Sequence, residues 1–148
     1  MGNENKVIGS IRSFNRFYTP IIGVLGQYMP GSNFSLVEIR VIWEIGFSGE
    51  CTARKLIKQL DIDTGYLSRI IKRLEKEGLL SRERSDSDGR IHILSLTAAG
   101  EKVRKVFEEL ADKKITALVS GLTLREQKKV VESMTVIQAI LSKGFNKC

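Results

Sequence analysis

Apolar side chains recur at steps of three and four residues through most of the chain, which is the spacing of one face of an α-helix. The pattern predicts four helices, a polar stretch near residue 84, and two further helices. They are expected at about 5–28, from Ser35 to about Gly46, from Thr52 to Leu60, from Asp63 to Gly78, and onward from Thr97 and from Thr123. Pro20 predicts a kink or a break near Thr19, because proline lacks the N–H that an inner helical turn needs.

The pattern changes to that of a β-hairpin after the fourth helix. Segments 79–83 and 90–96 flank the polar stretch 84–89, and the second flank alternates apolar and polar residues. Its apolar members are Ile91, either Ile93 or Leu94, and Leu96. The order of the elements therefore predicts a mainly α protein with a small β wing, which is a winged helix-turn-helix fold.

The third and fourth predicted helices have the spacing of a helix-turn-helix, with only the triplet 61–63 between them. The residues expected to face inward are Ala53, Leu56, Ile57 and Leu60 of the third helix and Leu67, Ile70, Ile71 and Leu74 of the fourth. The outer face of the fourth helix can then enter a DNA major groove. The residues expected at base edges or nearby phosphates are Thr64, Gly65, Tyr66, Ser68, Arg69, Lys72 and Arg73.

These positions carry different expectations. Gly65 would let the helix backbone approach the DNA closely, whereas Lys72 and Arg73 lie farther along the helix and suit phosphates. An ordinary solvated helix face would carry the same charges, so this helix alone leaves both interpretations open.

The tip of the hairpin strengthens the nucleic-acid interpretation. An arginine on a flexible wing, here Arg90, can enter a minor groove, and Asp88 could orient it through a charge-assisted hydrogen bond. The residues expected to add phosphate contacts are Arg54, Lys55, Lys76, Arg82 and Arg84. For Arg54 and Lys55 a solvated surface is an equal alternative.

The tract LIKQLDIDTGYLSRIIKRLEKEGLLSRERSDSDGRIHILSLTAAGE resembles the MarR-type winged-helix regulators. It contains the helix-turn-helix, a wing with an Asp-x-Arg tip, and the Leu-Thr-x-x-Gly start of the next helix. The resemblance implies that the fourth helix is the recognition helix, that Arg90 is the minor-groove arginine and that Asp88 is its orienting partner. It also implies a homodimer made by the first, fifth and sixth helices.

The succession of elements resembles the family over nearly the whole chain and implies one MarR-like domain over residues 1–148. About 30–96 would form the DNA-binding lobe, and about 5–28 and 98–145 the helical dimerisation region. A pocket between these regions would take a small aromatic or anionic effector. The aromatic residues that could line it, although such residues are more often plain core, are Phe14, Phe17, Tyr18, Trp43, Phe47 and Phe107.

Two features depart from the usual pattern of the family. Gly89 stands where a second wing arginine is common, so one phosphate or groove contact would be missing. The segment IRSFNRFYTPIIGVLGQ resembles the version of the family that is fused ahead of an acetyltransferase domain. The chain would then be either a stand-alone relative or the regulatory half of such a protein.

Charge and composition fit a DNA-binding protein and limit the alternatives. The chain has 24 Lys and Arg against 17 Asp and Glu, a net charge of +7 that attracts polyanions. It has neither an apolar run of about 18 residues nor the apolar core of a signal peptide, so we expect a cytoplasmic protein without a membrane partner.

Candidate chemistry is sparse. Cys51 and Cys148 make no ligand cluster or disulfide framework, and His92 is the single histidine, so no metal or other cofactor is expected. Cys51 is expected to be an ordinary small residue, with a redox switch as the alternative. No nucleophile with a base and no phosphate-binding loop stands out, so we expect no enzyme.

Together these observations predict a sequence-specific regulator of transcription that binds double-stranded DNA as a two-fold dimer. Its operator would be a near-palindrome, and it would act as a repressor relieved by a small-molecule effector. The alternatives are a regulatory or docking module of an acetyltransferase system, and a winged helix that binds protein or RNA.

Overall fold

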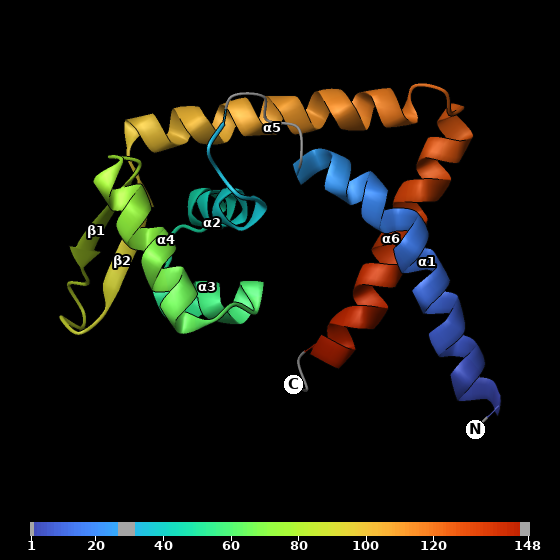
Figure 1. The fold of residues 1–148 in the computed structure, drawn as a ribbon, viewed down its shortest axis with the longest axis horizontal. Coiled ribbons are helices and arrows are strands. Elements are labelled where there is room, and N and C mark those ends of the chain that lie inside the picture. The colour runs from blue at the N-terminus through green and yellow to red at the C-terminus, as the bar shows by residue number, and fades with distance from the viewer. Residues whose placement is uncertain (1, 27–31, 146–148) are drawn as a thin grey trace. The chain divides into compact units, whose positions relative to one another are not determined.

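The computed structural model describes residues 2–26 and 32–145 (Figure 1). Over these residues it contains six helices and a two-stranded antiparallel sheet, so the predicted mainly α class with a β wing is confirmed. The elements are α1 (Gly2–Gly26), α2 (Leu36–Phe47), α3 (Ala53–Leu60), α4 (Thr64–Lys76), β1 (Leu80–Arg84), β2 (His92–Leu96), α5 (Ala98–Val119) and α6 (Leu124–Phe145).

The first helix differs from its prediction at two points. It begins at Gly2 rather than near residue 5, and its expected end at Tyr28 lies outside the described residues. The alternative of a break near Thr19 is wrong, because α1 is continuous through Pro20. Proline removes one N–H from the helix, and the turns on either side keep theirs.

The described residues fall into two compact units that divide between Ala111 and Asp112, within α5. The first unit contains the helix-turn-helix and the hairpin, in which α4 packs against β1 and α2 against β2. The second unit contains the end of α5 and all of α6.

The core of the first unit is built from α2, α3, α4, the hairpin and α5. Its buried apolar residues are Ile39, Val41, Ile42, Ile45, Cys51, Leu56, Leu67, Ile70, Ile71, Leu74, Leu79, Leu80, Leu94 and Phe107. The predicted inner face of α4 is therefore confirmed, and each buried Leu or Ile side chain contributes roughly 1.5–3 kcal/mol. In α3 only Leu56 is fully buried, and the expectation for Ala53 is wrong. Ala53 directly follows the N-cap and lies on the exposed side of the first turn.

Side-chain caps fix where the helices begin. Ser35 and Glu38 form the predicted capping box at α2, and Thr123 and Glu126 form the one at α6. The N-cap of α4 is Asp63, whose Oδ2 accepts from the Tyr66 N–H at 2.9 Å. At the other end of α4, Gly78 has a φ of 72°, a left-handed conformation that glycine adopts without steric cost.

The hairpin is shifted from the predicted strand limits. Arg84 pairs with His92 within the sheet, whereas Arg90 and Ile91 lie in the loop before β2. The Ile91 N–H donates to the Asp88 carbonyl at 2.9 Å, so a turn occupies the residues that alternation alone assigned to a strand. Leu94, and not Ile93, is the buried residue in the middle of β2.

Two contacts attach the hairpin to the rest of the unit. The Leu94 N–H donates to the Cys51 carbonyl at 2.7 Å, and the Thr97 hydroxyl donates to the Gly78 carbonyl at 2.6 Å. Gly100 lies against the Leu79 carbonyl, where a Cβ atom would collide with backbone. The Leu-Thr-x-x-Gly sequence thus caps α5 and seats its first turn on the base of the hairpin.

Candidate nucleic-acid interface

The outer face of α4 is a continuous exposed surface. The seven residues expected there, all exposed, are Thr64, Gly65, Tyr66, Ser68, Arg69, Lys72 and Lys76. None of them is a carboxylate, so this face presents hydroxyl groups, an aromatic ring and three cations. Neither Arg69, Lys72 nor Lys76 forms a salt bridge with any residue that the structure describes. Their charges are therefore available to an external anion.

Tyr66 and Arg69 form a pair on this face. The Arg69 guanidinium lies over the Tyr66 ring at 5.8 Å from the ring centroid, the geometry of a cation–π contact. The contact limits the freedom of an otherwise exposed arginine, because the two residues are one helical turn apart. An ordered guanidinium is better suited to a two-pronged hydrogen bond with a base edge.

Arg73 differs from the other cations of α4. It is half-buried, and its guanidinium donates to Glu77 Oε1 at 2.9 Å, to Glu38 Oε1 at 2.6 Å and to the Asn33 carbonyl at 2.9 Å. These contacts raise the pKa of Arg73 above its usual value, chiefly through the hydrogen bond with Glu77. The sequence grouped Arg73 with the DNA contacts, but the structure directs its N–H groups to protein acceptors.

At the wing, Asp88 performs a different task from the one expected. Its Oδ1 accepts from the backbone N–H of Arg90 at 3.0 Å, so the carboxylate shapes the loop rather than binding the guanidinium. The expected side-chain pair is thus replaced by a backbone contact, which is favoured because aspartate readily bonds to an N–H two residues on. Arg90 is exposed and forms no salt bridge within the described residues.

The remaining predicted phosphate contacts divide into paired and unpaired residues. Arg82 is paired with Glu75, through bonds of 3.1 and 3.0 Å that join β1 to α4. Lys55 donates to the Glu50 carbonyl at 3.3 Å at the start of α3. Arg54 and Arg84 are exposed, and neither has a salt-bridge partner in the described ranges. The structure thus brings the outer face of α4 and the wing together in one unit, with Arg73 and Arg82 used internally (Figure 1).

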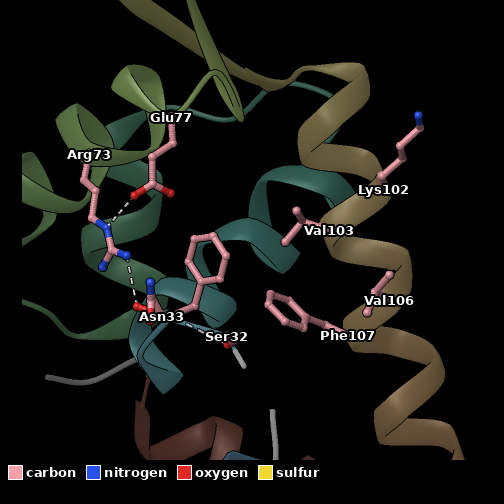
Figure 2. A pocket seen from close by; sticks show the side chains of 9 residues that line it. Ser32, Asn33, Arg73, Glu77, Lys102, Val103, Val106 and Phe107 are labelled. Atoms are coloured by element: carbon pink, nitrogen blue, oxygen red, sulfur yellow. Dashed lines mark hydrogen bonds and ion pairs between the residues drawn. The ribbon is translucent and has the colours of Figure 1, made fainter. Parts of the chain in front are cut away.

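A cavity of about 490 Å³ lies behind α4 in the same unit (Figure 2). It is lined by Ser32, Asn33 and Phe34 before α2, Arg73 and Glu77 at the end of α4, and Lys102, Val103, Val106 and Phe107 on α5. Phe34 and Phe107 pack edge to face, with ring centroids 5.7 Å apart. Figure 2 shows Arg73 directed toward Glu77 and Asn33, whereas Lys102 extends away from them. Arg73 is thus the cation nearest the aromatic rings of this cavity.

Only one of the aromatic residues expected to line a pocket, Phe107, lines this cavity. Phe14 and Tyr18 instead stack on each other along α1, and Phe47 lies under the Arg104 guanidinium. Trp43 is half-buried on α2 and does not line the cavity either. Phe17, on α1, is exposed. Sequence reasoning missed Phe34, although it precedes the N-cap Ser35, a position where an apolar residue often packs onto the helix that follows.

Other kinds of site have little support in the described part of the chain. It contains no group of three or more His, Cys, Asp or Glu residues placed to hold a metal ion, and no helix long and apolar enough to cross a membrane. His92 is exposed on β2. Cys51 is fully buried, and burial raises the pKa of its thiol, so the reactive thiolate is disfavoured.

Comparisons with known proteins agree with this geometry. Residues 34–92 match the model of the MarR family. The organic hydroperoxide resistance transcriptional regulator of Bacillus subtilis is 30% identical over 96 residues, which are 65% of this chain and 60% of that protein. The regulator MgrA of Staphylococcus aureus is 29% identical over 119 residues, covering 80% of this chain and 76% of MgrA.

A solved structure shares the fold over almost the full length. Streptococcus pneumoniae FabT, solved in complex with DNA, has a TM-score of 0.72 at 22% identity, covering 96% of this chain and 97% of FabT. The family match includes the helix-turn-helix and most of the wing, the elements that form the exposed surface described above. The chain belongs to the MarR family of winged helix-turn-helix transcriptional regulators.

Proposed function

We propose that the protein binds double-stranded DNA as a homodimer and regulates transcription, without catalytic activity of its own. The observation that carries the proposal is the carboxylate-free outer face of α4, with unpaired Arg69, Lys72 and Lys76, in the same compact unit as an exposed Arg90. The relatives are named as transcriptional regulators, and FabT was solved with DNA. Acting on DNA would place the protein in the cytoplasm.

In this proposal the outer face of α4 enters a major groove. Thr64, Tyr66, Ser68 and Arg69 lie in the first half of the helix and would meet base edges, while Lys72 and Lys76 would hold phosphates. Gly65 adds no side chain where the backbone would come closest. Arg90 would enter the adjacent minor groove, held in place by the turn that Asp88 forms.

Dimerisation is supported by apolar side chains that remain exposed on α1, on the end of α5 and on α6. Those more than 40% exposed include Val7, Ile8, Ile11, Phe14, Phe17, Ile115, Leu118, Val131, Met134, Ile137, Ile140 and Leu141. Apolar surface of this extent is typical of a protein–protein interface. A two-fold dimer would place two recognition helices about 34–36 Å apart, so the operator would be a near-palindrome.

The cavity behind α4 supports regulation by a small molecule. Phe34, Phe107 and the valines of α5 offer an apolar surface for an aromatic ring, and Arg73 offers a charge partner for a carboxylate. We therefore propose that a small aromatic or anionic effector binds there and relieves repression. It can do so only by binding the DNA-free arrangement more tightly than the DNA-bound one.

A titration with different nucleic acids tests the proposed function. Duplexes enriched by the purified protein from a random-sequence pool, matching single strands and matching RNA would be titrated at several salt concentrations. We expect tight binding to the duplex alone, with an affinity that falls steeply as salt rises. Equal binding to RNA, or no binding to any duplex at low salt, would refute the proposal.

A further inference from the structure

Arg73 joins three parts of the first unit that are far apart in the sequence. Its Nη1 lies 2.6 Å from Glu38 on α2, its Nε lies 2.9 Å from Glu77 after α4, and its Nη2 lies 2.9 Å from the Asn33 carbonyl. The guanidinium also lies over the Phe34 ring at 5.5 Å from its centroid. One side chain of α4 is therefore held from several directions.

The partner of Arg73 on α2 is itself fixed. Glu38 is only 6% exposed, and its second carboxylate oxygen accepts from the Ser35 N–H at 2.7 Å in the capping box of α2. A carboxylate buried to this degree is unfavourable without a cation and hydrogen bonds around it. Arg73 and the capping box supply these together, so the pair ties the second half of α4 to the first turn of α2.

We infer that Arg73 is a positioning residue, which sets the recognition helix against α2 through Glu38 and does not neutralise a DNA phosphate. The inference rests on the proposed function, because it concerns how α4 is presented to DNA. It also replaces the sequence-based assignment of Arg73 to the DNA contacts. A lysine cannot perform this task, because its ammonium group has no planar fork to bond several acceptors in fixed directions.

Binding to the enriched duplex by four variants tests this role: Arg73→Gln, Arg73→Lys, Glu38→Gln and the double variant Glu38→Gln/Arg73→Gln. If Arg73 positions α4, Arg73→Lys loses roughly as much affinity as Arg73→Gln although it keeps the charge. The double variant then binds about as weakly as the weaker single variant, since both changes break the same link. Circular dichroism would establish that each variant is folded.

Lys72→Gln is the matched control, because Lys72 is the unpaired neighbour on the same helix. It should lower the slope of log affinity against log salt by about 0.9, the value for one lost phosphate contact, and its effect should add to that of Glu38→Gln. An Arg73→Lys variant that binds like the wild type, or an Arg73→Gln effect that adds fully to that of Glu38→Gln, would overturn the inference.

The failure of this inference can be separated from failure of the proposed function. A wild-type protein that binds no duplex refutes the proposed function and the positioning role that depends on it. Thermal unfolding of the same four variants needs no DNA and still shows whether Arg73 and Glu38 are coupled. Coupling in unfolding together with additive effects on DNA binding would refute positioning alone.

Discussion

At the scale of single residues, Arg69 is the side chain of α4 best suited to read a base. It is exposed, unpaired and held over Tyr66, and an arginine can bond O6 and N7 of guanine together. The exposed face carries no asparagine or glutamine, the residues that bond adenine in the same two-pronged way. We therefore expect a guanine at the position that Arg69 reaches.

Replacing Arg69 with alanine should relax discrimination at one G·C pair of each half-site. The expected loss for that pair is about 1–3 kcal/mol, the usual value of a bidentate contact, with little change in preference elsewhere. Titrating duplexes with every single base-pair substitution would measure it. Arg69→Lys is the control, because it keeps the charge but loses the fork. A uniform loss over all sequences would identify Arg69 as a phosphate contact instead.

Glu126 gives a prediction about pH. Its carboxylate accepts from the Thr123 backbone N–H at 2.8 Å and from the Thr123 hydroxyl at 2.9 Å, and these bonds lower the pKa of Glu126 below its usual value. A lowered pKa means that the ionised group stabilises the folded state above the pKa of the unfolded chain. This stabilisation is lost as pH falls through the lower folded pKa.

Glu126→Ala should therefore lower the melting temperature at neutral pH and have a smaller effect in acid. Melting curves of both proteins across this pH range would test it, with exposed Glu109, which lies in the middle of α5, replaced by alanine as the control. A difference in melting temperature that stays constant down to strongly acid pH would mean that ionisation of Glu126 is irrelevant to the cap.

At the scale of elements, the wing presents Arg90 from a loop rather than from a strand. Two bonds to Asp88 shape that loop, one from the Arg90 N–H to its carboxylate and one from the Ile91 N–H to its carbonyl. Arg90→Ala should weaken duplex binding substantially, because an arginine in a narrow minor groove meets a concentrated negative potential. The dimer should stay intact.

Anisotropy titrations of Arg90→Ala beside Arg84→Ala would show whether the tip of the wing matters more than its strand. Arg84 is also exposed and has no salt-bridge partner in the described segments, but it lies inside β1. Equal affinity of Arg90→Ala and the wild type would remove the wing from the mechanism.

The elements themselves were predictable because their signals are local. Apolar spacing located the buried face of α4, and side chains within three residues of each helix start defined the caps. The exceptions arose where a turn competed with the pattern. Alternation extended β2 back to Arg90, but the hydrogen bonds of Asp88 close a loop there.

Charge pairing was not predictable, because its distances in space are unrelated to its distances in sequence. Arg73 and Glu38 are 35 residues apart, and each looks like an ordinary surface residue in its own helix. Arg82 and Glu75 likewise pair across the boundary between α4 and β1. The sequence therefore identified the cations of the candidate interface but could not separate those that bind protein from those left for DNA.

At the scale of the whole molecule, the cavity illustrates the same limit. Its lining comes from the segment before α2, the end of α4 and the first turns of α5, which no periodicity connects. The family resemblance implied a pocket but not its residues, and Phe34 became evident only through its contacts with Phe107 and Arg73. Apolar faces of helices, in contrast, are visible in a sequence whether or not a partner covers them.

Those exposed faces give the prediction that concerns the assembly. Ile137 lies in the middle of the apolar surface of α6 and is 42% exposed, so Ile137→Glu would place an unpaired carboxylate inside the proposed dimer interface. We expect this variant to be monomeric in sedimentation and to bind a two-half-site duplex roughly a hundredfold more weakly or worse, since the second half-site no longer binds intramolecularly.

Thr135→Glu is the matched control, because it adds the same charge two residues away, on nearly the opposite side of the helix. It should leave both the dimer and the affinity intact. The salt dependence separates loss of assembly from local damage to α4. A monomer makes half the phosphate contacts of a dimer, so the slope of log affinity against log salt should fall by about half. If Ile137→Glu remained dimeric, or became monomeric with the full slope, the DNA-binding unit would not require the surface of α6.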